Sequence, residues 1–208
     1  MNRKILRFLI VALAAGLGLA LSAKLFTPKG TVNPPPDLET VTLLPTPRTL
    51  PAFTLESSNG PVTQQSLSGH WTVIFIGFSH CPDVCPTTLT DLARAQKLWQ
   101  DSGLGNKPRL LFVSIDPERD SPKILADYAA YFNKDTLTAT ANEPQLSAFT
   151  RAIGLVYMKV PQGDSYTMDH SATLVLLNPK GEFAGIIRPP FKPDAIARDL
   201  LTLTKRMP

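Results

Sequence analysis

The chain of 208 residues is long enough for one globular domain with additional segments, and 43% of its residues are hydrophobic, which supports a packed core. Its net charge of +4 is mild, and no basic stripe is interleaved with aromatic residues, so nucleic acid is not an expected partner. Two cysteines are too few for a disulfide scaffold.

The N-terminus has the pattern of a membrane segment. A short basic end, MNRK, leads into the mostly apolar stretch Ile5–Phe26. As a helix with a rise of roughly 1.5 Å per residue, this stretch would be about 33 Å long, enough to cross a bilayer. We therefore predict that residues 1–27 form a basic cytoplasmic end and an uncleaved transmembrane anchor, with a signal peptide cleaved around Ala20–Ala23 as the alternative.

The placement of basic residues sets the expected orientation. The basic end stays in the cytoplasm and the rest of the chain is exported. That end is too short for an organelle presequence, and no cysteine follows the apolar run to carry a lipid anchor. We predict a single-pass protein of the bacterial inner (cytoplasmic) membrane, with its domain facing the periplasm or the cell exterior.

A proline-rich linker is predicted over residues 28–52. Residues 28–51 contain seven prolines and no aromatic residue. Such a composition favours extended polyproline geometry and a semi-rigid spacer between membrane and domain. A linker without a spacer role is the alternative.

Residues 53–208 alternate predicted strands and helices. The predicted elements, in chain order, are an added hairpin within 53–70, a buried central strand over Trp71–Phe78, a helix over Thr87–Gln100, a strand over Arg109–Ile115, a helix starting with Ser121 and Pro122, a short helix from about Asn142, a hairpin over Ala172–Ile187 and a helix over Pro193–Thr204. This order predicts an α/β fold, a thioredoxin-like sandwich around a central mixed sheet.

Both cysteines lie in GFSHCPDVCPTT, residues 77–88. Cys81 and Cys85 follow the central strand and enter the N-terminus of a helix, which favours thiolate over thiol. A structural disulfide between them would close a very short loop and add little stability. A thiol–disulfide exchange enzyme is compatible with the fold, but its usual spacing is Cys-x-x-Cys, and it carries a cis-proline where MDHSAT (168–173) has none.

A metal site is the third interpretation of the cysteine pair. Two thiolates suit Cu(I), and one imidazole would complete a three-coordinate site. Among the three histidines, His70 is expected in a solvated loop, and His80, adjacent to Cys81, is expected to have a structural or supporting role. His170 is predicted to begin the hairpin strand opposite the cysteines, and it is therefore the favoured third ligand.

Three segments together resemble one protein family. GFSHCPDVCPTTL (77–89), SIDPERDSP (114–122) and MDHSATLVLLNPKGEF (168–183) are similar to the three characteristic segments of the Sco/SenC family of copper chaperones, bacterial type. The resemblance runs from about Phe53 to the C-terminus. It implies a thioredoxin-like domain that binds one copper ion, Cu(I) or Cu(II), through Cys81, Cys85 and His170.

The resemblance also implies a function and partners. The family serves assembly of the dinuclear copper centre in cytochrome c oxidase subunit II, so that subunit, a copper donor of unknown identity and the membrane are the expected partners. Some members act instead as thiol–disulfide reductases that keep the subunit's cysteines reduced. The ligand set of this sequence matches the family throughout, so both a metallochaperone and a redox enzyme stay open.

Further residues near these segments have weaker assignments. We expect Asp169 and Asp83 to be solvated, with orientation of His170 and tuning of the site's charge as their alternatives. The polar residues of the middle segment are expected to form a turn and a helix start: Asp116, Glu118, Arg119 and Asp120. Met158 and Met168 are soft ligands in principle, but a lone methionine usually serves packing.

Overall fold

The computed structural model describes residues 36–206. The predicted anchor at 1–27 and the first part of the predicted linker lie outside the described residues. Within the described range, none of the helices combines the length and the apolar character needed to cross a bilayer.

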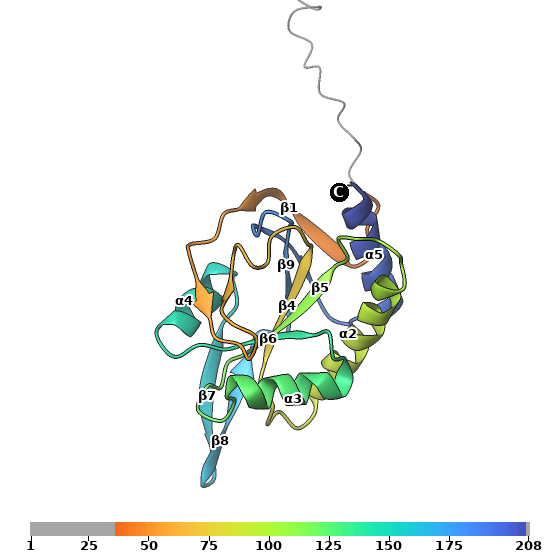
Figure 1. The fold of residues 1–208 in the computed structure, drawn as a ribbon. Helices are drawn as coiled ribbons and strands as arrows, with labels where there is room; N and C mark the ends of the chain where they lie inside the picture. The colour runs from red at the N-terminus through yellow and green to blue at the C-terminus, as the bar shows by residue number, and fades with distance from the viewer. Residues whose placement is uncertain (1–35, 207–208) are drawn as a thin grey trace, which may run out of the picture. The chain divides into compact units, whose positions relative to one another are not determined.

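A six-stranded mixed sheet forms the centre of the domain, with strand order β1-β10-β9-β4-β5-β6 (Figure 1). Strands β4, β5 and β6 run parallel, whereas β9, β10 and β1 pair antiparallel. Its strands are β1 (Val41–Arg48), β4 (Thr72–Gly77), β5 (Arg109–Ser114), β6 (Leu137–Ala139), β9 (Leu174–Leu177) and β10 (Phe183–Ile187). All six residues of β4 are buried, as its continuous apolar sequence predicts for a central strand covered on both faces.

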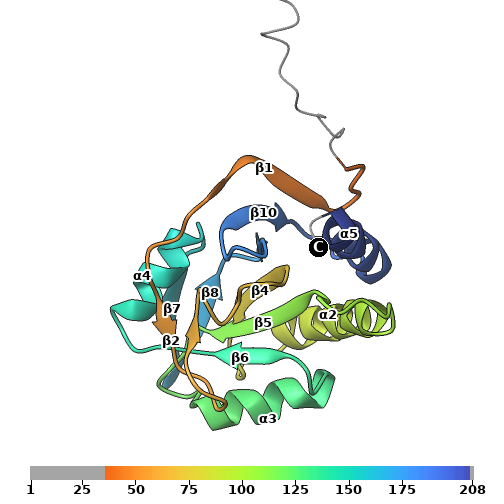
Figure 2. The ribbon, with the colours of Figure 1, turned by 45° about the horizontal axis from the view of Figure 1, so that its top comes forward.

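Within residues 36–206, four helices flank this sheet: α2 (Val84–Gln100), α3 (Pro122–Phe132), α4 (Gln145–Ala152) and α5 (Pro193–Arg206). Helices α2 and α5 lie side by side on one side of the sheet, and α4 lies on the other (Figures 1 and 2). Helix α3 starts as predicted, because the Ser121 hydroxyl accepts the Ile124 N–H at 3.4 Å and Pro122 fills the first helical position.

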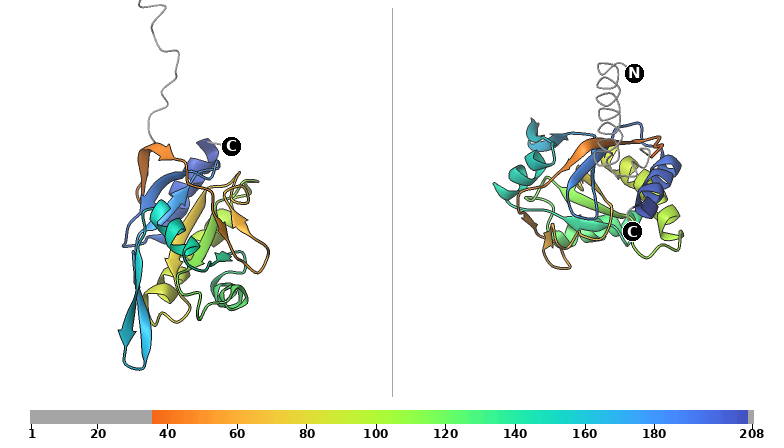
Figure 3. Two further views of the ribbon diagram at one scale, coloured as in Figure 1. Left: turned by 90° about the vertical axis from the view of Figure 1, so that its left-hand side faces the viewer. Right: turned by 90° about the horizontal axis from the view of Figure 1, so that it is seen from above.

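Two small antiparallel ribbons complete the fold: β2 (Thr54–Leu55) with β3 (Val62–Thr63), and β7 (Tyr157–Gln162) with β8 (Ser165–His170). The first confirms the added hairpin expected within residues 53–70. The β7–β8 ribbon projects from the body of the domain (Figure 3). It was not predicted, because most of its side chains are exposed or half-buried and no apolar stripe marks it.

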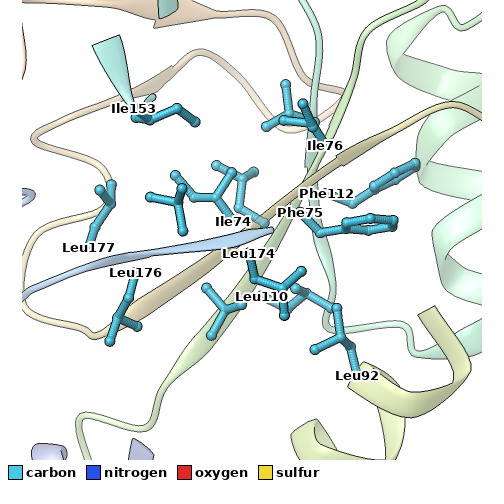
Figure 4. Close-up of a cluster of buried hydrophobic side chains, with 14 of the residues drawn as sticks. Ile74, Phe75, Ile76, Leu92, Leu110, Phe112, Ile153, Leu174, Leu176 and Leu177 are labelled. Carbon is cyan, nitrogen blue, oxygen red and sulfur yellow. The ribbon is translucent and has the colours of Figure 1, made fainter. Parts of the chain in front are cut away.

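The core lies between the sheet and its helices, where side chains from β4, β5 and β9 meet those of α2 (Figure 4). Phe75 and Phe112 stack with ring centroids 5.6 Å apart, and both are at most 1% exposed. Since β4 and β5 are held rigidly by this packing, the segments that follow their carboxyl ends start from fixed positions.

Strand β1 corrects the predicted linker, because residues 41–48 lie within the range 28–52. The N–H groups of Thr40 and Val41 donate to the Asp199 carboxylate of α5 at 2.7 and 3.0 Å, and the strand pairs with β10. Its prolines are tolerated because β1 is an edge strand whose register is interrupted between Leu43 and Arg48. The sheet therefore begins before the predicted boundary at residue 53.

Two further boundaries differ from the sequence prediction. Helix α2 begins at Val84 rather than Thr87, so Cys85 lies within its first turn. His170 ends β8, opposite Tyr157, rather than beginning the strand of the predicted hairpin, which consists of β9 and β10. His170 nevertheless lies directly before β9, on the chain segment that was predicted to face the cysteines.

Candidate metal centre

The two cysteines lie beyond the carboxyl end of β4. Cys85, the second residue of α2, is fully buried, and Cys81 is half-buried in the preceding turn. Both are free thiols, and the Cys85 N–H donates to Cys81 Sγ at 3.4 Å. The helix start therefore brings the two sulfurs to the same place, with Cys81 on the solvent side.

The third predicted ligand lies beside the buried thiol. His170 Nε2 is 3.7 Å from Cys85 Sγ, and its ring packs edge-on against Phe75 and Phe78. Nδ1 lies 3.0 Å from the Ser171 carbonyl, which can only accept, so Nδ1 carries the proton and donates. Nε2 then presents its lone pair to the sulfur, which is the tautomer that a metal ligand requires.

The predicted ligands touch in pairs, Cys81 with Cys85 and Cys85 with His170. Within residues 36–206, no three histidine, cysteine or acidic side chains are already arranged as a metal-binding group. Cys85 is therefore the predicted ligand that contacts both of the others.

Burial dominates the protonation of both inner groups. It raises the pKa of the Cys85 thiol, and the nearby Cys81 and Asp120 act in the same direction. It also lowers the pKa of His170, against the opposing effect of the Ser171 carbonyl. At Cys85, burial therefore outweighs the stabilisation of the thiolate that was predicted from the helix N-terminus. A metal that binds this sulfur would have to displace the proton of the thiol.

The raised pKa of Cys85 predicts a loss of stability in alkaline solution. Once the pH exceeds about 9, the ordinary value for this thiol, the unfolded chain loses a proton that the folded chain keeps. The free energy of unfolding should then fall by up to about 1.4 kcal/mol per pH unit. We expect denaturant titrations of the reduced, metal-free protein to show this slope, and Cys85→Ala to lack this part of it. Equal slopes for the two chains would contradict the assignment.

Asp120 holds the turn before Cys81. Its fully buried carboxylate accepts the Ser79 N–H at 2.9 Å, the Ser79 hydroxyl, and the Ser114 hydroxyl at 2.5 Å. It thereby joins the chain after β4 to the end of β5. The sequence predicts only a turn and a helix start for this residue, because a buried carboxylate and a solvated one look alike in sequence.

A second cluster fastens the β7–β8 ribbon to the segment after β5. Arg119 forms an ion pair with the buried Asp116, donates to the Tyr166 carbonyl at 3.1 Å and lies 3.8 Å from the centroid of the Tyr166 ring. The Tyr166 hydroxyl donates to Asp116 at 2.8 Å, and Lys159 pairs with Glu118. The middle segment thus holds the ribbon at whose end His170 lies.

The remaining candidates have other environments. His70 is hydrogen-bonded to the Lys107 carbonyl at 2.8 Å, and His80 to the Ser79 hydroxyl at 2.9 Å. Met158 is 61% exposed and Met168 is buried. His170 Nδ1–H donates its hydrogen bond to the Ser171 carbonyl rather than to Asp169, whose side chain is exposed.

Comparison with known proteins identifies relatives of this chain. The SCO1/SenC family model matches residues 42–205. A Stutzerimonas stutzeri protein whose name refers to copper binding is 34% identical over 173 residues, which cover 79% of this chain and 81% of that protein. The Arabidopsis thaliana protein SCO1 homolog 1, mitochondrial, is 36% identical over 134 residues, covering 63% of this chain but only 40% of the longer relative.

Solved structures share the fold. Arabidopsis thaliana ScoI with copper bound has a TM-score of 0.69 at 29% identity, covering 76% of this chain and 98% of that one. Bradyrhizobium japonicum ScoI with copper bound has a TM-score of 0.68 at 31% identity, covering 74% and 98%. These neighbours confirm the predicted thioredoxin-like α/β fold. With the family model matched along the whole sheet and its helices, the chain belongs to the SCO1/SenC family.

Proposed function

We propose that this protein is a copper chaperone, which binds one copper ion through Cys81, Cys85 and His170 and delivers it to the dinuclear copper centre of cytochrome c oxidase subunit II. The observation that carries the proposal is the distance of 3.7 Å between His170 Nε2 and Cys85 Sγ. Because Nδ1 is committed to the Ser171 carbonyl, the free lone pair faces a soft sulfur ligand.

The donor set fits copper as a cargo. Two sulfurs and one imidazole nitrogen suit Cu(I), which accepts low coordination numbers. Cys81 lies on the exposed side and Cys85 and His170 on the buried side, so a partner's thiolates can approach the ion from the Cys81 side. Stepwise exchange of ligands then moves the copper without its release into water. Relatives solved with copper bound support this cargo.

The proposed location follows from the sequence. An anchor over residues 1–27 would hold the domain at the outer face of the bacterial inner membrane. The copper donor and the oxidase subunit would then both be reached on that side.

Removal of any one ligand should abolish tight copper binding. The test uses the full-length chain, reduced and purified in mild detergent, in competition with a chromophoric Cu(I) chelator. We expect one copper per chain, and a loss of affinity of more than about 100-fold in Cys81→Ala, Cys85→Ala and His170→Ala, since even outer partners of ligands are worth 10–100-fold.

His70→Ala is the matched control, because His70 is hydrogen-bonded to the Lys107 carbonyl and lies before the amino end of β4, whereas the cysteines lie beyond its carboxyl end. It should bind copper like the unchanged protein. Full affinity in His170→Ala would refute the three-ligand site.

One observation supports a second function, reduction of disulfides in the same subunit. The half-buried Cys81 above the buried Cys85 has the arrangement of an attacking thiol and a resolving thiol. The substrate disulfide would take two electrons as Cys81 and Cys85 form their own disulfide, which a separate dithiol reductant would reopen. Copper-free turnover that is unchanged in His170→Ala would favour this function.

A further inference from the structure

A shallow groove of about 240 Å³ lies directly beside the cysteine turn, between the start of α2 and the segment after β10. We call it the α2 groove. Its lining comprises Phe75, Asp83, Val84, Thr87, Thr88, Asp91, Ala172, Pro189 and Phe191. Two of these residues lie between the cysteines in the sequence, and Ala172 follows closely after His170. The groove is therefore formed in part by the two chain segments that carry the proposed ligands.

The α2 groove has a buried apolar floor and several accessible apolar side chains in its walls. Phe75 forms the floor, and its ring also packs against the His170 ring. Val84 is 53% exposed, Phe191 is half-buried and Pro189 is exposed. Ligand pockets for drug-sized molecules usually measure roughly 300–1,000 Å³, so this groove suits one or two side chains of a docked polypeptide better than a small molecule.

The α2 groove also contains two carboxylates, Asp83 and Asp91. Asp83 stands at the N-cap of α2, yet its side chain makes no capping hydrogen bond. Asp91 lies two turns further along the same face, and within residues 36–206 neither carboxylate has an ion-pair partner. No basic side chain lines the groove, although the whole chain has a net charge of +4. The negative charge is therefore a local property of this surface.

We propose that the α2 groove docks the copper-accepting protein through a segment that presents a lysine or arginine beside an apolar side chain. The apolar side chain would cover Val84 and Phe191, and the cation would meet Asp91 and Asp83. This inference rests on the proposed function and names the chemistry of the partner at the same site. Carboxylates at the edge of a docking surface mainly accelerate encounter, and their effect weakens as salt increases.

Asp91→Lys tests the docking surface while leaving the proposed copper ligands intact. Asp101→Lys is the matched control, because it makes the same charge change on an exposed residue at the other end of α2. The full-length chain, loaded with copper, is mixed with the reduced, copper-free subunit II domain of the same organism. Copper content of the two separated proteins is followed over time, at low and at high salt.

We expect Asp91→Lys to slow transfer at least about tenfold at low salt and to remove most of its salt dependence, with unchanged copper affinity. Asp101→Lys should transfer like the unchanged chain, and Phe191→Ala should slow transfer at both salt concentrations. Equal rates and equal salt dependence for Asp91→Lys and the unchanged chain would overturn the docking surface alone. If the unchanged chain binds copper but never delivers it to the subunit, the proposed function is wrong. The proposed partner of the α2 groove is then wrong as well.

Discussion

Asp120→Ala is expected to lower the free energy of unfolding by about 2–4 kcal/mol. The substitution removes the acceptor of three hydrogen bonds, from the Ser79 N–H, the Ser79 hydroxyl and the Ser114 hydroxyl. Ser114 is fully buried, so water cannot replace the lost partner there. Each buried donor left without an acceptor costs about 1–3 kcal/mol, and the partial exposure of Ser79 keeps its share low.

Urea denaturation of the reduced, metal-free protein measures this loss. The control is Asp127→Ala, which removes an exposed carboxylate that pairs with the exposed Lys123 on α3. Such a pair contributes little, so the control should stay within about 0.5 kcal/mol of the unchanged chain. Equal stabilities for the two variants would show that Asp120 does not hold the turn.

The same substitution should also weaken copper binding. Asp120 fixes the chain two residues before Cys81, so its loss loosens the more exposed of the two sulfurs while Cys85 remains held in α2. A site whose ligands must first be ordered binds with lower affinity, because the ordering cost is subtracted from the binding energy. Copper affinity and stability should therefore fall together in Asp120→Ala.

The elements predicted correctly are those whose cause lies within a few residues. The apolar runs of β4 and β5, and the Ser121–Pro122 start of α3, are local patterns, and the structure confirms them. The cysteine pair at a strand–helix junction is likewise local. His170 was predicted as a ligand by a different route, from the order of elements in the fold and from the family resemblance, because nothing in its own neighbourhood marks it.

The features that were not predicted from the sequence depend on contacts between residues far apart in the chain. Strand β1 contains prolines typical of a linker, and its pairing with β10 and its hydrogen bonds to Asp199 join residues far apart in the chain. The β7–β8 ribbon is fastened by Arg119 and Tyr166, which are also distant in sequence. The buried carboxylate of Asp120 is hydrogen-bonded to Ser79 and Ser114, and no local sequence pattern indicates these contacts.

At Gly77 the backbone of β4 lies close to the Cys85 sulfur and the Phe112 ring, so we expect a large loss of stability and copper affinity when this glycine is replaced. A Cβ at this position would lie 2.8 Å from Cys85 Sγ and 3.0 Å from Phe112 Cε2. The backbone of Gly77 cannot retreat easily, because it pairs with Ser114 of β5 and its carbonyl accepts the Ile115 N–H at 2.9 Å. The strain must therefore move the sulfur or the ring.

We expect Gly77→Ala to destabilise the metal-free protein by about 1–3 kcal/mol, the usual cost of overpacking a core. Because Phe112 is clamped by its stacking on Phe75, the Cys85 sulfur is the group more free to shift, and copper affinity should fall at least about tenfold. Gly105→Ala is the control, since nothing lies within 4 Å of its added Cβ and its φ is not in the left-handed region. If urea denaturation and chelator competition gave the same results for both variants, the glycine would have no role in admitting the sulfur. Copper affinity could fall by more than the loss of stability in Gly77→Ala accounts for. That result would mean that β4 shapes the site directly, by leaving room for Cys85 beside His170.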